Sequence, residues 1–272
     1  IRGRKISLSF DEREILQKYQ LCELPEKWIW TTVRTVADDE PNSITDGPFG
    51  SNLKTEHYTQ SGPRVIRLQN IGDGFFINNF AHISDERFNS LKKHQILSGD
   101  LVIAGLGESL PRACIIPDYV GEAIVKADCI RFKPDSLLSN NIYLNAVLNS
   151  RLIKDIVITI VHGIGRPRLN QQEIKAIPIP LPPIDEQYAI AEELQRAFSL
   201  SDDIERKIER SLTRIELTRK TILQRAYSGE LVDQNLDDEP ASVLLQRIQV
   251  EREEREMLQR QAAKPKKEKK KV

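Results

Sequence analysis

Two carboxylates and a lysine are the residues in this sequence whose types could support metal-dependent hydrolysis. Asp118 follows Pro117, and Glu173-Ile174-Lys175 lies 55 residues further on. This order imitates the nuclease pattern in which two carboxylates hold Mg²⁺ and a lysine assists the attack of water. The gap is long for that pattern. A metal-dependent nuclease using Asp118, Glu173 and Lys175 is therefore an alternative hypothesis, not the first one.

Other motifs for catalysis or cofactor binding are missing from the sequence. It has no G-x-x-x-x-G-K-[ST] loop and no methyltransferase tetrapeptide of the N-P-P-[FY] type. Gly105 and Gly107 form G-x-G without the third glycine of a dinucleotide-binding motif. The histidines show no metal-ligand spacing, and they are His57, His82, His94 and His162. We expect no ATP hydrolysis, no methyl transfer, no metal ion and no cofactor.

The composition is that of a soluble, foldable protein, with 39% hydrophobic and 29% charged residues among 272. No run approaches the roughly 20 apolar residues of a membrane span, and the opening residues lack a signal peptide's apolar stretch. We expect a cytoplasmic protein, and the start at Ile1 suggests a fragment or a processed product. The cysteines are odd in number and widely spaced, so we expect buried, unpaired thiols at Cys22, Cys114 and Cys129.

The net charge of zero hides an uneven distribution along the chain. The terminal segment 264–272 has six lysines and one glutamate, so the other 263 residues hold 34 basic (40 − 6) and 39 acidic (40 − 1) groups. The body of the protein thus has a net charge of −5 (34 − 39). Global charge gives no support to nucleic-acid binding. The lysine-rich end is typical of a solvated tail or linker.

Residues 25–180 contain many short apolar runs bounded by turn residues, which predicts a β-rich mixed domain. Segment 63–80 is predicted to form a strand, a Gly-Asp-Gly turn and a second strand, with Arg67 and Gln69 on one strand face. Segment 97–107 predicts a turn and a buried strand. The other two predictions are a strand pair or a long bent strand over 122–134 and a helix in the first half of 140–161.

Beyond Pro183 the pattern changes to a long helix. Glycine and proline are absent from 184–228, and apolar or small residues recur in alternating steps of four and three. A helix of this length cannot bury its apolar stripe on itself, so it needs a partner helix from this chain or another. The large residues expected in the pairing seam are Ile190, Leu194, Ile204, Ile208, Ile215 and Ile222.

Four prolines between 178 and 183 make the entry to this helix stiff and extended, because each fixes its own backbone and restricts the preceding residue. Asp185 and Glu186 then suit the first helical turn, where the helix dipole favours acids. Such a joint fixes the angle between a compact domain and a rod. A coiled-coil scaffold without DNA contact is a second alternative, since rods commonly serve assembly alone.

Five segments stand in a characteristic order along the chain: "LPEKWIW" (24–30), "DGPFGSNL" (46–53), "LSGDLVIAGLG" with "PRACIIP" (97–117), "RLNQQEIKAIPIPLPPIDEQ" (168–187) and "ILQRAYSGELV" (222–232), with "DDEPASVLLQRI" (237–248) just after. In this order they resemble the specificity subunits of type I restriction-modification enzymes. The resemblance spans about residues 22–250. Full subunits of this family have two recognition domains and two long helices. This chain has one of each and resembles half a subunit.

The resemblance implies an α+β fold with four parts: an N-terminal extension (1–21), a β-rich target-recognition domain (22–183), a long coiled-coil helix (184–229) and a charged tail that is flexible or partly helical (230–272). It also implies a non-catalytic protein that reads a half-site of double-stranded DNA. Methyltransferase subunits, and through them the restriction subunit, would be its partners. A second recognition half would join by helix pairing, as a homodimer or within the same chain.

Within such a domain, base reading needs Arg or Lys for guanine and Asn or Gln for adenine, on exposed loops and strand edges. The loop 47–54, the strand near 67–70, the glycine loop 105–112 and the segment 163–168 offer such residues. The candidates are Ser51, Asn52, Lys54, Arg67, Gln69, Asn70, Ser109, Arg112, Arg166 and Arg168. Each could equally be an ordinary surface residue or a turn former.

Overall fold

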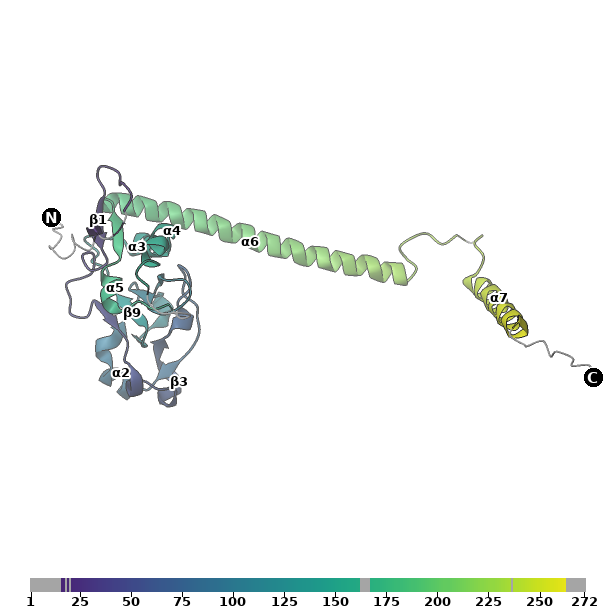
Figure 1. The fold of residues 1–272 in the computed structure, drawn as a ribbon, viewed down its shortest axis with the longest axis horizontal. Helices are drawn as coiled ribbons and strands as arrows, with labels where there is room; N and C mark the ends of the chain where they lie inside the picture. The colour runs from purple at the N-terminus through teal and green to yellow at the C-terminus, as the bar shows by residue number, and fades with distance from the viewer. Residues whose placement is uncertain (1–15, 18, 20, 162–166, 236, 263–272) are drawn as a thin grey trace, which may run out of the picture. The chain divides into compact units, whose positions relative to one another are not determined.

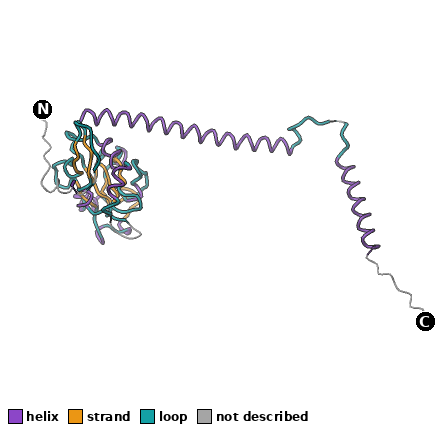
Figure 2. The backbone as a smooth tube through the Cα atoms, turned by 45° about the horizontal axis from the view of Figure 1, so that its top comes forward, coloured by secondary structure: helices purple, strands orange, loops and turns teal. Residues whose placement is uncertain are grey.

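The computed structural model describes residues 16–17, 19, 21–161, 167–235 and 237–262 (Figure 1). The chain divides into two compact units, Ile1–Leu200 and Ser201–Val272. In its described residues the first unit combines strands with short helices, and the second contains helices and turns (Figure 2). The fold class is α+β, as predicted. No helix in the described residues is long and apolar enough to cross a membrane.

The strands of the first unit form three small sheets in the described part of the chain. Their bounds are β1 (Ile29–Thr32), β2 (Ile44–Asp46), β3 (Tyr58–Ile66), β4 (His82–Ile83), β5 (Gln95–Ile96), β6 (Leu101–Ala104), β7 (Arg112–Ile115), β8 (Ala123–Val125), β9 (Cys129–Phe132) and β10 (Pro178–Leu181). One sheet pairs β1 with β10, and the others have the orders β2-β9-β6-β7 and β4-β3-β8-β5. All pairings are antiparallel except that of β3 with β8.

Strand β6 is central to the hydrophobic core. Its four residues are fully buried, and it lies between β7 and β9. A run of consecutive apolar residues suits a strand that is covered on both faces. The buried strand predicted within 97–107 is thus confirmed. The segment 122–134 forms a pair of strands, β8 and β9, which lie in different sheets.

Of the strand, turn and second strand predicted over 63–80, the structure bears out the first two. The first strand is β3, and the Gly-Asp-Gly turn is closed by an isolated bridge between Ile71 and Phe76, but the second strand is wrong. Strand β3 ends one residue before Arg67, and Leu68–Asn70 forms a 3-10 turn. The side-chain oxygen of Asn70 accepts a hydrogen bond from the backbone N–H of Arg67 at 2.9 Å, which competes with continued sheet pairing. The next strand, β4, begins only after residue 80. Arg67 and Gln69 therefore do not share a strand face.

The helices of the first unit are short apart from the last. They are α2 (Asp85–Ser90), α3 (Asn141–Asn149), α4 (Arg151–Val157), α5 (Gln171–Lys175) and the start of α6 (Ile184–Tyr227). The helix predicted in the first half of 140–161 is confirmed as α3, and the second half is also helical. Ser150 separates α3 from α4 with an extended backbone, and its Oγ accepts from Ile153 N at 3.3 Å, as an N-cap does.

The proline-rich segment is strand β10, which pairs with β1. Pro178 and Pro180 have no N–H to donate, which suits a small sheet with open edges. Tyr143 Oη, on α3, donates a hydrogen bond to Pro180 O at 2.6 Å. The stiff extended entry predicted from the prolines is thus a strand bonded to the domain core.

Helix α6 covers 44 residues, which corresponds to about 66 Å at 1.5 Å per residue. It ends near Gly229, as predicted, where the left-handed φ of +74° and the bond from Glu230 N to Arg225 O at 2.8 Å close the last turn. A further helix, α7 (Ala241–Ala262), occupies much of the segment predicted to be flexible or partly helical.

The cysteine prediction is confirmed in part. Cys114 and Cys129 are buried in the core, whereas Cys22 is exposed, which contradicts the expectation for that residue. Burial raises the pKa of the Cys114 thiol to about 12 and also raises the pKa of Cys129. Both buried thiols are therefore protonated at neutral pH and behave as small apolar side chains.

Candidate functional site

The loop that follows β3 brings a guanidinium and two amides together. Arg67 Nη2 donates to Asn79 Oδ1 at 2.5 Å and to Phe80 O at 3.0 Å. One terminal atom of the Gln69 amide lies 2.8 Å from Asn79 Oδ1 and 2.7 Å from Arg67 Nη2. We call Arg67, Gln69 and Asn79 the amide–guanidinium cluster. Sequence analysis selected the first two members but missed Asn79, because only the folded loop brings it to them.

Arg64 bonds the backbone of Asn79 in this cluster, and sequence analysis did not select it either. Arg64 as a residue is 6% exposed. Its guanidinium lies 4.7 Å from the Phe80 ring centroid and 5.7 Å from that of Phe76, and it donates to Asn79 O at 3.1 Å. Burial lowers the pKa of Arg64, yet an arginine remains a cation at neutral pH. The available sequence signal was weak, because the aromatic residues Phe76 and Phe80 follow Arg64 only after 12 and 16 positions.

Asn70 is fully buried, which contradicts its expected place on an exposed strand edge. Its Nδ2 donates to Ile77 O at 2.9 Å and to Asn79 O at 2.7 Å, and its Oδ1 accepts from Arg67 N. All of its hydrogen-bonding groups are therefore directed at the protein's own backbone. In this structure Asn70 holds the loop in place and does not face a ligand.

Tyr58 and Lys126 extend the cationic surface beside the cluster. Lys126 Nζ donates to Tyr58 Oη at 3.0 Å and lies 5.3 Å from its ring centroid, while the Arg67 guanidinium lies 5.8 Å from the same ring. A Cβ on Gly47 would lie 2.2 Å from Lys126 C. The loop 47–54 therefore begins in direct contact with the backbone at Lys126.

The predicted residues of loop 47–54 lie on the surface. Ser51 and Asn52 are exposed within the 3-10 turn Gly50–Asn52. Lys54 is also exposed and forms an ion pair with Glu56 at 3.4 Å. Because the loop starts next to Lys126, it adjoins the surface that includes Tyr58 and the amide–guanidinium cluster.

The glycine loop and the segment near Arg168 form a second cluster. Gly107 N donates to Pro167 O at 3.1 Å, and a Cβ on Gly107 would lie 3.4 Å from an Nη atom of Arg112. Arg168 Nη2 binds Asp128 Oδ1 at 2.8 Å. Ser109 is exposed in the same loop, whereas Arg166 lies outside the described residues.

The turn 126–129 lies between the two clusters. Lys126 contacts Tyr58 on one side, and two residues later Asp128 binds Arg168 on the other. Asp128 has a left-handed φ of +65°, and its carbonyl accepts from Gly105 N at 2.8 Å, which brings the glycine loop to the turn. Residues of the predicted regions 47–54, 67–70 and 105–112, and Arg168 from the described part of 163–168, thus lie next to one turn that the predictions did not include.

The residues of the nuclease hypothesis are used for local structure. Asp118 accepts a hydrogen bond from Ser98 Oγ. Glu173 accepts from Asn170 N at 2.7 Å and forms a capping box at the start of α5, and Lys175 is the last residue of that helix. No group of three potential metal ligands occurs in the described residues.

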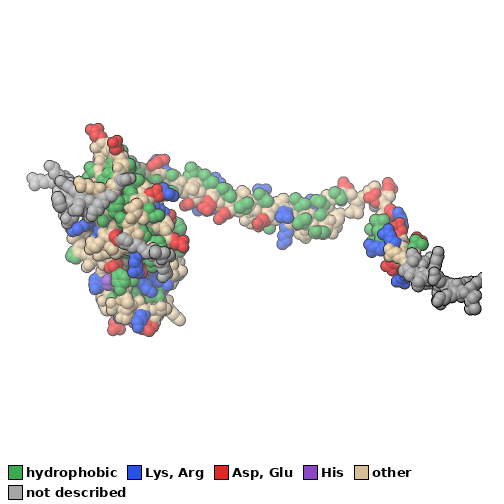
Figure 3. All heavy atoms as spheres, in the orientation of Figure 1, with side chains coloured by type: hydrophobic (Ala, Val, Ile, Leu, Met, Phe, Trp, Pro, Cys, Tyr) green, Lys and Arg blue, Asp and Glu red, His purple; other side chains and the backbone are tan. Residues whose placement is uncertain are grey.

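The apolar stripe of α6 is exposed over much of the helix (Figure 3). Its large side chains have exposed fractions of 49% for Ile204, 55% for Ile208, 64% for Ile215 and 48% for Ile222. The earlier seam residues differ, because Ile190 packs against the core of the first unit and Leu194 is half-buried.

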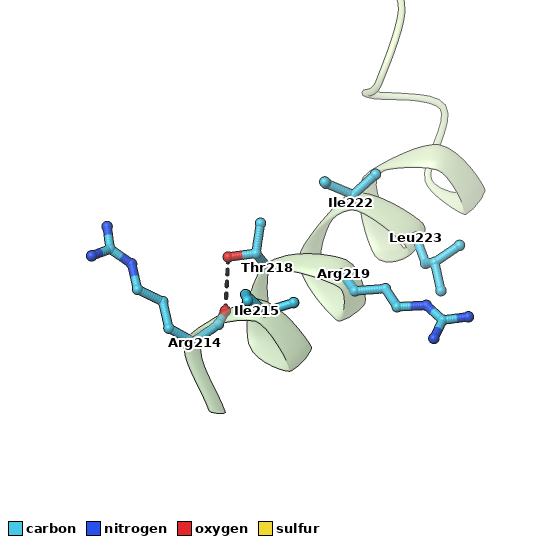
Figure 4. Close-up of a pocket in the computed structure, with 6 residues that line it drawn as sticks. All are labelled: Arg214, Ile215, Thr218, Arg219, Ile222 and Leu223. Carbon is cyan, nitrogen blue, oxygen red and sulfur yellow. Dashed lines mark hydrogen bonds between the residues drawn. The ribbon is translucent and has the colours of Figure 1, made fainter. Parts of the chain in front are cut away.

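Near its end, α6 has a shallow apolar pocket lined by Ile215, Thr218, Ile222 and Leu223 between two arginines (Figure 4). Thr218 Oγ1 donates to Arg214 O at 2.9 Å, so the hydroxyl is satisfied within the helix. The same holds for Ser211, which donates to Lys207 O. These polar residues therefore do not require a polar partner across the stripe.

A mixed α+β unit with cationic and amide side chains on adjoining loops, followed in sequence by a helix with an exposed apolar stripe, is typical of a nucleic-acid-binding module that assembles through a helix. Residues 71–214 match the family model of the type I restriction modification DNA specificity domain, and the chain belongs to this family. The family resemblance seen in the sequence is thus confirmed.

Two relatives indicate how much of the family's length this chain represents. It is similar to the type I restriction enzyme EcoBI specificity subunit of Escherichia coli, with 25% identity over 87% of this chain and 50% of that protein. It is also similar to the MjaVIII specificity subunit of Methanocaldococcus jannaschii, with 24% identity over 83% of this chain and 51% of that protein. The chain therefore spans about half the length of these curated relatives.

Two solved structures share the fold. The crystal structure of the HsdS subunit from Thermoanaerobacter tengcongensis matches with a TM-score of 0.55 and 17% identity, over 81% of this chain and 53% of that one. A chain from a study of complex assembly and conformational transition of the type I R-M system matches with a TM-score of 0.59 and 16% identity, over 81% and 51%. At these identities the likeness establishes the fold alone.

Proposed function

We propose that the chain is a non-catalytic, cytoplasmic subunit that recognises one half-site of a bipartite double-stranded DNA target. In this proposal residues 22–183 are the recognition domain and 184–229 the pairing helix, preceded by an extension (1–21) and followed by a charged tail (230–272). Methyltransferase subunits bind to it and connect it to a restriction subunit. The convergence of the two side-chain clusters on the turn 126–129 is the observation that supports the proposal most strongly.

Cations gathered at one place on the surface can bind DNA phosphates although the net charge of the chain is zero. Most affinity for DNA comes from neutralising phosphates, and the chain as a whole is neutral. Arg67 and Lys126 lie beside Tyr58, and Arg112 and Arg168 lie on the other side of the turn. Such a patch places cations and hydrogen-bonding amides on one surface, as reading of base edges requires.

The exposed stripe of α6 supports pairing with a second recognition half. Its large apolar side chains are covered by nothing in the described residues, and the chain spans half the length of its relatives. A second copy, or a second half within the same natural chain, would cover the stripe with its own helix. A homodimer would place two identical readers on one target and select an interrupted palindrome.

The proposal is tested by exposing the purified chain to a library of random-sequence DNA duplexes and sequencing the retained molecules. We expect one short motif to be enriched, with binding that weakens as salt rises. A parallel pull-down with a type I methyltransferase subunit should retain the chain. Retention of DNA without any enriched sequence, at all salt concentrations, would contradict a recognition function and favour a scaffold.

A further inference from the structure

Two buried polar side chains hold the loop 71–80 at one point of its backbone. Asn70 is fully buried and donates from Nδ2 to Asn79 O at 2.7 Å. Arg64, only 6% exposed, donates from Nη2 to the same oxygen at 3.1 Å. Burying an amide and a guanidinium is unfavourable unless their polar atoms are bonded, and the Arg64 Nε is buried without a hydrogen-bond partner in the described residues. Directing both at one carbonyl of a surface loop fixes the position of Asn79.

Aromatic rings complete this support. The Arg64 guanidinium lies over the Phe76 and Phe80 rings, at 5.7 and 4.7 Å from their centroids. The Phe80 ring stacks on His82, with 6.1 Å between the ring centroids. Phe80 is nevertheless 64% exposed, so the outer face of the loop is open to solvent. The loop is thus rigidly supported on its inner side and accessible on its outer side.

The accessible side presents polar groups that are already aligned with one another. Asn79 Oδ1 accepts from Arg67 Nη2, and the Gln69 amide contacts both of these residues. Asn79 and Gln69 are exposed, and Asn79 Nδ2 has no protein partner in the part of the chain that the structure describes. Side chains that are ordered before binding lose less conformational entropy when a ligand arrives.

Two amides and one guanidinium match a particular kind of base edge. In the major groove a purine presents N7 together with an exocyclic group, which Asn or Gln reads in adenine and Arg reads in guanine through paired hydrogen bonds. A pyrimidine lacks N7 and presents a single hydrogen-bonding group there. The cluster therefore fits a purine.

We propose that Arg67, Gln69 and Asn79 form one reading unit for the major-groove edge of a purine, and that Arg64 and Asn70 are its positioning residues. The inference rests on the proposed DNA-recognition function and assigns a ligand to one part of the recognition surface. Arg64 and Asn70 act through the backbone of Asn79 and make no contact with the base.

The test uses the full chain and the random-duplex selection, followed by the same selection with variants. In Asn79→Ala and in Gln69→Ala we expect one purine position of the motif to lose its preference by about 5- to 150-fold, while the other positions keep theirs. The neighbouring Asn78→Ala is the matched control, because Asn78 is also exposed but has no bond to the cluster. It should leave the motif unchanged.

Arg64→Lys tests the positioning role at constant charge. A lysine lacks the planar guanidinium that lies over the two rings and bonds the Asn79 carbonyl, so we expect the same purine position to be relaxed. An equal loss of affinity at every position with the motif intact would overturn the positioning role, since that result describes a general cation.

The two proposals fail in distinguishable ways. If the wild-type chain enriches a motif that both Asn79→Ala and Gln69→Ala leave unchanged, the purine-reading unit is wrong and the recognition function stands. If the wild-type chain enriches no motif, the recognition function is wrong and this inference falls with it. Because the Gln69 side chain is exposed, its variant should fold even if the loop of Asn79→Ala does not.

Discussion

Gln187 Oε1 accepts a hydrogen bond from the backbone N–H of Asn140 at 2.9 Å, although 47 residues separate the two. Its Nε2 donates to Leu138 O and Pro182 O, both at 3.0 Å. The Gln187 side chain is fully buried. One amide thus bonds the first turns of α6 to the segment that precedes α3, which makes the start of the long helix an integral part of the first unit.

Replacing this amide should destabilise the first unit. Gln187→Ala leaves one N–H and two carbonyls without their partner, so we expect the free energy of unfolding to fall by about 2–4 kcal/mol in urea titration. Gln195→Ala is the matched control, because Gln195 lies exposed on the same helix and should change it by less than about 0.5 kcal/mol. Equal effects of the two variants would contradict the anchoring role.

A buried ion pair gives a second stability prediction. Arg131 Nε binds Asp100 Oδ2 at 2.7 Å between strand β9 and the turn before β6. Asp100→Ala leaves the guanidinium buried without its partner and should lower the free energy of unfolding by about 3–5 kcal/mol. The exposed Asp202→Ala serves as the control in the same urea titration. A small effect at Asp100 would mean that water or another group replaces the carboxylate.

The same pair predicts a pH dependence. Burial raises the pKa of Asp100 above its ordinary value, against the opposing effects of the Leu97 N–H and Arg131. The native state therefore binds a proton at the Asp100 carboxylate more tightly than the unfolded chain does. Its stabilising contribution is complete below the ordinary pKa and declines as pH rises through the raised value. Relative to Asp100→Asn, the wild-type free energy of unfolding should thus fall as pH increases above about 4.

The sequence predicted elements whose pattern is local and missed contacts that depend on turns. Four consecutive apolar residues identified β6, and the absence of glycine and proline identified α6. The two-residue period failed at Arg67, because one amide from Asn70 bonds the backbone and turns the chain. That turn brings Asn79 to Arg67, and no sequence period predicts a contact between such residues. The exposure of the candidates in loop 47–54 could be predicted, because the turn-forming residues of that loop are visible in the sequence.

The nuclease alternative leads to a prediction about chemistry. The purified chain should neither cleave nor methylate DNA when Mg²⁺, ATP or a methyl donor is added. Glu173→Ala should act on stability alone and lower the free energy of unfolding by about 1 kcal/mol, because it removes half of a capping box. Cleavage by the wild-type chain that disappears in both Asp118→Ala and Glu173→Ala would overturn the non-catalytic assignment.

The ion pair between Arg168 and Asp128 leads to a prediction that distinguishes a phosphate contact by Arg168 from a base contact. Arg168 is 56% exposed and its charge is partly offset by the carboxylate. Asp128→Asn keeps a residue that tolerates a left-handed backbone and releases the arginine, so DNA binding should tighten on all sequences. Arg168→Ala should weaken binding uniformly and reduce the salt slope by about 1. A change of the enriched motif in either variant would instead make Arg168 a base reader.

Pairing through α6 is the prediction on which the assembly depends. Ile204, Ile208, Ile215 and Ile222 lie along one stripe, and burial of each would contribute about 1.5–3 kcal/mol. A self-complementary antiparallel pairing covers both stripes through one symmetric contact. We therefore expect the chain to sediment as a dimer at micromolar concentration, and Ile204→Asp/Ile208→Asp to sediment as a monomer.

The control for this variant lies on the same helix. Leu217 is 61% exposed, but at 100° per residue it projects on the side opposite Ile215, away from the stripe. Leu217→Asp should therefore leave the dimer intact, although it also places an aspartate at an exposed apolar position of α6. Circular dichroism separates loss of pairing from loss of helix. A wild-type monomer with α6 fully helical would contradict the pairing, because no other described segment covers the stripe.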